Sequence, residues 1–114
     1  MRVDIRTQGI ELSDSLRDHI DRCLNFGLDW ARHDIARVVI SLSDINGPRG
    51  GADKRCQIRI PLPRSRGVQI EEIAGDLQIA TARAVDRAAR TLERRLARQR
   101  EFGPLLPTTE GSLS

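Results

Sequence analysis

The strand pattern of this protein is clearest in residues 38–60, VVISLSDINGPRGGADKRCQIRI. Apolar and polar side chains alternate at both ends of this stretch, which is the period of a strand with one buried face. Its middle, from Asp44 to Asp53, is rich in turn-forming Gly, Pro, Asn and Asp. We therefore predict two strands joined by a loop. The side chains that we expect to face the core are Val38, Ile40, Leu42, Cys56, Ile58 and Ile60.

Strands are also predicted on both sides of this stretch. Val3 and Ile5 alternate with charged residues, which indicates an N-terminal strand. Val68 and Ile70 indicate a short fourth strand near the middle of the chain. One face of the resulting sheet is apolar and needs a cover.

Two helices are predicted from capping residues and helical spacing. Ser13 is the expected N-cap of a helix that ends near Asp29. Asp76 is the expected cap of a long helix that reaches about Arg100. On the apolar face of the first helix, the small Gly27 is expected either to allow a close approach to the sheet or to begin the end of the helix.

These elements predict a single α+β domain in the order β-α-β-β-β-α, a four-stranded sheet with two helices packed on one face. A chain of 114 residues has room for one core. We assign residues 1–102 to this domain and expect residues 103–114, rich in Gly, Pro, Ser and Thr, to be a disordered tail. No segment approaches the ~20 apolar residues of a membrane span.

The charge composition favours an anionic partner. The net charge is +3, the sequence pI is about 9.6, and all but one of the 19 basic residues are arginine, the exception being Lys54. The planar guanidinium group matches phosphate oxygens, although genomic base composition can also produce an arginine bias. Cys23 and Cys56 lack metal-ligand spacing, so we expect buried thiols in a reducing compartment. Without a signal peptide pattern, the predicted location is the cytoplasm.

The last helix carries the strongest functional signal. At 100° per residue, five arginines share a narrow sector opposite an apolar face centred on Val85 and Leu92. Like charges at helical spacing repel by ~0.2–0.5 kcal/mol per pair, so a nearly pure arginine stripe favours an anionic partner over an ordinary solvated face. The stripe consists of Arg83, Arg87, Arg90, Arg94 and Arg98.

A second basic group lies around the predicted hairpin. It contains Arg49, Lys54, Arg55, Arg59, Arg64 and Arg66. This group fits an RNA contact about as well as a flexible hairpin with charged residues at its strand edges. The only aromatic residues are Phe26, Trp30 and Phe102, and none lies within the basic stripe. Because readers of single-stranded RNA stack bases on aromatic rings, phosphate and shape contacts to folded RNA suit this chain better.

The sequence gives little support to catalysis, so we predict that the protein is not an enzyme and needs no cofactor. His19 and His33 have no nearby nucleophile pattern, and His19 is expected at the surface because it falls off the apolar face. Three aspartates of the first helix, Asp14, Asp18 and Asp21, could hold a metal ion. More simply, we expect them to form a solvated face that pairs with Arg17 and Arg22 at helical spacing.

Three stretches together resemble the ribosome hibernation-promoting factor family. They are residues 3–17, which include GIELSDSLR, residues 42–56, LSDINGPRGGADKRC, and the last helix around AVDRAAR at 84–90. The resemblance implies the predicted fold and binding to the small ribosomal subunit, in the channel for mRNA and tRNA. It matches Arg87, Arg90 and Arg94 to basic positions of the family's last helix, and Lys54 and Arg55 to a hairpin pair. This chain has Gln78 where many relatives have an aromatic residue. Because it stops soon after the last helix, we expect it to be a short form without the C-terminal dimerisation domain of the long forms.

We therefore expect a factor that binds small-subunit rRNA and blocks translation in idle or stressed cells. The expected rRNA-binding residues are Arg49, Lys54, Arg55, Arg83, Arg87, Arg90, Arg94 and Arg98. Two alternatives stay open, a structured-RNA-binding module acting off the ribosome and an interaction protein that docks on an acidic protein partner. No membrane, metal ion or small-molecule substrate is predicted, and a monomer is favoured.

Overall fold

The computed structural model describes residues 1–45 and 53–102. Their elements are β1 (Arg2–Gln8), α1 (Asp14–Leu28), a 3₁₀ helix η1 (Asp29–Asp34), β2 (Arg37–Asp44), β3 (Lys54–Ile60), β4 (Val68–Ala74) and α2 (Leu77–Phe102). The predicted order and the α+β class are confirmed. The expected disordered tail, the inner part of the loop after β2 and Arg49 lie outside the described residues.

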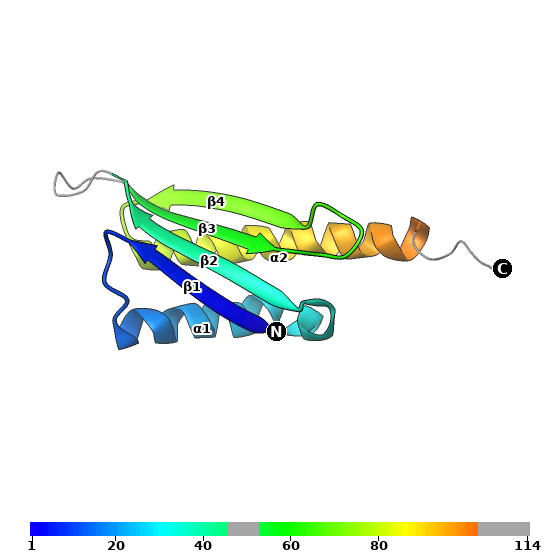
Figure 1. Ribbon diagram of the computed structural model, residues 1–114, viewed down its shortest axis with the longest axis horizontal. Helices are drawn as coiled ribbons and strands as arrows, with labels where there is room; N and C mark the ends of the chain where they lie inside the picture. Colours follow the sequence, from blue (N-terminus) through cyan, green and yellow to red (C-terminus); the bar gives the residue numbers. More distant parts are fainter. Residues whose placement is uncertain (46–52, 103–114) are drawn as a thin grey trace.

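One four-stranded sheet forms the first layer, with its strands side by side in sequence order, β1-β2-β3-β4. β1 and β2 are parallel because α1 crosses over between them, whereas β2, β3 and β4 pair antiparallel. Figure 1 shows both helices on the same side of this sheet, with α1 alongside β1 and α2 behind β3 and β4. Within the described residues, the other face of the sheet has no helix over it.

The core lies between the sheet and the helices, as the alternating strand pattern predicted. The inward residues of β2 and β3 are almost fully buried, among them Ile40, Leu42 and Ile58. Ile20, Leu24 and Leu92 meet them from the helices and are equally buried. β4 is longer than the short strand that we predicted, because every residue from Val68 to Ala74 has a register partner on β3.

Both predicted helix caps are confirmed. The Ser13 hydroxyl accepts a hydrogen bond from the Leu16 N–H at 3.1 Å. The Asp76 carboxylate accepts one from the Gln78 N–H at 2.6 Å. Each cap satisfies a backbone donor that the first helical turn leaves without a partner.

The contact between α1 and α2 changes what we expected for Gly27 and for His19. A Cβ atom at Gly27 would lie 2.7 Å from Val85 Cγ1, so this glycine allows close approach to the other helix and not to the sheet. His19 is half-buried, not a free surface residue. Its Nε2 lies 3.1 Å from the carbonyl oxygen of Gln78, because the start of α2 covers that side of α1.

Candidate nucleic-acid interface

Five arginines form an exposed ridge along α2, here called the arginine ridge. Its members are Arg83, Arg87, Arg90, Arg94 and Arg98, all exposed. The opposite side of the helix is buried in the core, through Thr81, Val85, Ala88, Leu92 and Leu96. Because these mainly apolar residues fix the rotation of the helix against the sheet, the arginine side chains have to project into solvent.

Most of the ridge keeps its charge available to a partner. In the described part of the chain, Arg83 and Arg98 form no ion pair. Arg94 reaches only the neutral hydroxyl of Thr91, at 3.4 Å. Arg90 pairs with Asp86 one turn earlier at 2.7 Å, and both side chains are well exposed, so water screens that pair strongly.

Arg87 differs from the rest of the ridge because it is tied to β4. Its guanidinium pairs with the Glu72 carboxylate and donates to the Glu71 carbonyl oxygen at 3.1 Å. The Glu72 side chain is 18% exposed and that of Arg87 is 49% exposed. Glu72 was not predicted from the sequence, although a carboxylate on the core face of a strand needs a cationic partner. Arg87 therefore joins a helix to the edge of the sheet as well as adding to the ridge.

The basic pair at the start of β3 is also held by neighbours. Lys54 Nζ lies 2.9 Å from Asp44 Oδ2, and Arg55 Nε donates to the Ser43 hydroxyl at 3.1 Å. Both contacts follow from the strand register, which places Asp44 opposite Lys54 and Ser43 opposite Arg55. Lys54 is thus less available to an outside anion than the free members of the ridge.

The hairpin end and the arginine ridge share one end of the molecule. Lys54 is in register with Ala74, the last residue of β4, and α2 begins at Leu77. Figure 1 shows the start of α2 beside the ends of β2 and β4. Lys54 and the start of α2 therefore lie at the same end of the molecule, whereas Arg55, like Arg59, lies on the open face of the sheet.

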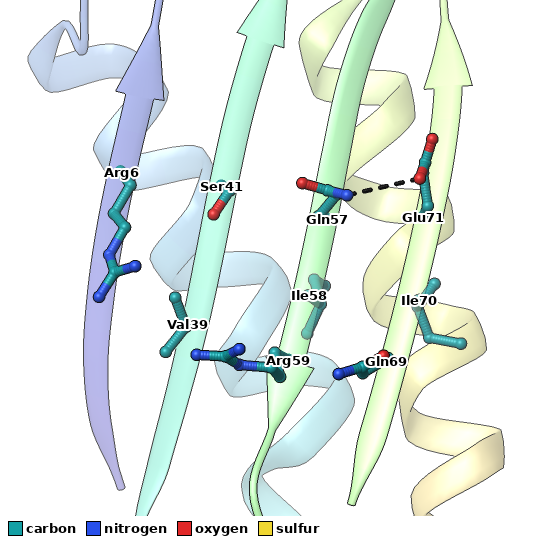
Figure 2. A pocket seen from close by; sticks show the side chains of 9 residues that line it. All are labelled: Arg6, Val39, Ser41, Gln57, Ile58, Arg59, Gln69, Ile70 and Glu71. Atoms are coloured by element: carbon teal, nitrogen blue, oxygen red, sulfur yellow. Dashed lines mark hydrogen bonds between the residues drawn. The ribbon is translucent and has the colours of Figure 1, made fainter.

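The open face of the sheet carries a second group of polar residues, only some of which were considered from the sequence. The side chains of Arg6 on β1 and Arg59 on β3 line a shallow hollow of about 400 Å³ (Figure 2). Its other lining residues are Val39, Ser41, Gln57, Ile58, Gln69, Ile70 and Glu71. Strand alternation alone predicts that Arg6 and Arg59 lie on the same face of the sheet. Only the strand order shows that a single strand, β2, lies between them.

A comparison with known protein families shows to which family this chain belongs. Residues 3–100 match the family described as sigma 54 modulation protein / S30EA ribosomal protein. The chain belongs to this family. The match spans nearly all the described residues and confirms the family resemblance seen in the sequence.

Solved structures with the S30EA fold agree with this assignment. The N-terminal domain of Protein Y from Thermus thermophilus is 27% identical, with a TM-score of 0.67, and the match covers 83% of this chain and 99% of that one. A ribosomal subunit interface protein from Coxiella burnetii is 20% identical, with a TM-score of 0.63, and the match covers 89% of this chain and 99% of that one, which supports the fold alone. Among curated proteins, none matches this chain.

The aspartates of α1 in this S30EA family member form neither the metal site nor the ion pairs that we considered in the sequence. Within residues 1–45 and 53–102, no three His, Cys, Asp or Glu side chains are grouped as metal ligands. Asp14, Asp18 and Asp21 also form no ion pair with Arg17 or Arg22 in these ranges, so the pairing that we expected is wrong. No helix in the described part of the chain is long and apolar enough to cross a membrane.

Proposed function

We propose that this protein binds the small ribosomal subunit through rRNA and blocks the channel for mRNA and tRNA in idle or stressed cells. The arginine ridge would contact rRNA phosphates, with Lys54, Arg55 and Arg49 adding contacts at the hairpin end. The site of action would be the cytoplasm, where ribosomes are. Occlusion of this kind needs no catalytic group and no cofactor.

The observation that carries the proposal is the excess of free positive charge along α2. Arg83, Arg94 and Arg98 have no carboxylate partner in the described ranges, and the ion pair of Arg90 is solvent-exposed. A helix face that bears mainly one sign of charge gains free energy by releasing the counterions of a phosphate backbone. Folded RNA offers closely spaced phosphates that a rigid helix can follow.

The name of one of the two structural neighbours favours a ribosomal partner over other anions. One is called Protein Y, and the other is called a ribosomal subunit interface protein. The family description includes a ribosomal protein as well. A general RNA-binding module or a protein that docks on an acidic partner would use the same ridge, so the test must separate these partners.

The test is co-sedimentation with purified small subunits through sucrose gradients at low and high salt. We expect the wild-type protein to travel with the subunits at low salt and to leave them as salt rises. Substituting Arg83, Arg94 and Arg98 together by Gln should weaken binding strongly. It should also reduce the slope of log K against log salt concentration, the salt slope, by about 0.9 for each phosphate that is no longer neutralised. These three positions avoid Arg87, whose removal would also disturb the contact with β4.

A matched control removes the same charge from the other helix region. The variant R17Q/R22Q/R32Q changes exposed arginines outside the ridge and the hairpin, and should bind nearly as the wild type does. Competition by isolated duplex RNA as strong as that by small subunits would favour the general RNA-binding module. Failure of the wild-type protein to sediment with subunits at any salt would overturn the proposal.

A further inference from the structure

Two arginines from different strands line one hollow on the open face of the sheet. Figure 2 shows Arg59 extending from β3 to a position over β2, while Arg6 lies along β1 on the same face. The register explains this geometry, because Arg59 is opposite Val39 and Arg6 is opposite Ser41, two residues further along β2. The short side chains of β2 leave room for both guanidinium groups above them.

The carboxylates nearest to these arginines are already engaged. Asp4, which lies beside the hollow on β1, accepts a hydrogen bond from Arg37 at 2.7 Å and is 3.7 Å from Arg2. The hydrogen bond from Arg37 lowers the pKa of Asp4 below its ordinary value, so this carboxylate is ionised and paired at neutral pH. Neither Arg6 nor Arg59 forms an ion pair in the part of the chain that the structure describes.

The remaining carboxylate of the hollow lies on its far side. Glu71 on β4 is opposite Gln57, whose amide donates to it at 3.4 Å. Both residues are drawn on the side of Figure 2 away from Arg6. The half of the hollow between β1 and β3 therefore holds both guanidinium groups. The carboxylate on the same face of β1, Asp4, attracts Arg6 as well, but its hydrogen bond is made with Arg37.

The floor and rim of that half suit an anion with oxygen acceptors. Val39 is only 4% exposed although no helix of the described chain covers it, so the floor is apolar and largely shielded from water. The Ser41 hydroxyl on β2 can donate a hydrogen bond in addition to the two guanidinium groups. Arginine forks bind phosphate through paired N–H donors, and a shielded floor strengthens such contacts.

We propose that the hollow binds a phosphate group between Arg6 and Arg59, and that this phosphate belongs to the RNA backbone. The source of the phosphate rests on the proposed function, whereas the site itself does not. Since the arginine ridge lies on the helix layer and the hollow on the opposite face of the sheet, RNA would hold the protein from two sides. A free phosphate or nucleotide has the same chemistry and is separated from RNA by the test.

The site is tested first without any ribosome, by titrating inorganic phosphate and adenosine monophosphate into ¹⁵N-labelled protein and following the backbone amides by NMR. We expect saturable shifts centred on Arg6, Val39, Ser41 and Arg59, which disappear in the R6Q/R59Q variant. The variant R17Q/R22Q removes the same charge from α1 and should keep these shifts. Shifts spread over all basic residues, or none at the hollow, would overturn the site.

The source of the phosphate is tested by small-subunit binding of the same variants. We expect R6Q/R59Q to weaken binding several-fold and to reduce the salt slope by about 1, as for one phosphate, while R17Q/R22Q binds as the wild type. If R6Q/R59Q binds subunits normally but no longer shows the shifts with adenosine monophosphate, the RNA assignment is overturned in favour of a free phosphate ligand. If the wild-type protein does not bind small subunits at all, the proposed function fails, while the phosphate titration still decides whether the hollow binds phosphate.

Discussion

Gly27 of α1 lies directly against Val85 of α2, and a Cβ atom at position 27 would come within 2.7 Å of Val85 Cγ1. Val85 is β-branched and 3% exposed, so its methyl groups have little freedom to move aside. This contact sets how closely the two helices approach. It thereby helps to set the position of the arginine ridge relative to the sheet.

Gly27→Ala should destabilise the protein even though alanine is the better helix former. Overpacking costs about 1–3 kcal/mol and the better helix propensity offsets about 1 kcal/mol of this, so we expect a small net decrease in the free energy of unfolding. In a Val85→Ala background the clash is absent, and the same substitution should become stabilising by up to about 1 kcal/mol. Urea denaturation of the four proteins in this cycle measures the change of sign. The same effect of Gly27→Ala in both backgrounds would show that the helices do not meet at this contact.

Arg87 should contribute more to stability than its neighbours on the arginine ridge. Arg87→Gln leaves the mostly buried Glu72 carboxylate without its cation and also removes the donor to the Glu71 carbonyl oxygen. We expect a decrease of about 1 kcal/mol in the free energy of unfolding, a value kept small by the exposure of Arg87. Arg94→Gln, which removes only an interaction with Thr91, is the matched control and should change stability by less than about 0.5 kcal/mol. Equal decreases for both variants would contradict a structural role of the Arg87–Glu72 pair.

The two thiols should differ in reactivity. Burial raises the pKa of the Cys56 thiol to about 11, so only about one molecule in a thousand carries the thiolate at pH 8. Cys23 is partly exposed, although burial raises the pKa of its thiol as well. Iodoacetamide should therefore label native Cys23 much faster than native Cys56, and unfolding in guanidinium should remove the difference. Peptide mass spectrometry after timed labelling measures both rates, and rapid native labelling of Cys56 would place it outside the core.

The sequence was sufficient for the order of the strands and α-helices because their signals are local, whereas the 3₁₀ helix η1 was not predicted. Alternating residues marked the strands, Ser13 and Asp76 marked the starts of the helices, and the spacing of Val85 and Leu92 identified the buried face of α2. The arginine ridge followed from the same periodicity, since a helix that buries one side must expose the other. The likeness to the ribosome hibernation-promoting factor family was also visible in the sequence.

Only the tertiary structure decided which of these charges are free. Arg87 pairs with Glu72, Lys54 with Asp44 and Arg37 with Asp4 because strands and helices distant in sequence lie side by side. The closeness of Gly27 to Val85 and the place of Arg6 and Arg59 around one hollow arise in the same way. Local periodicity determines the face on which a side chain lies, but the availability of its charge depends on neighbours that only folding brings within reach.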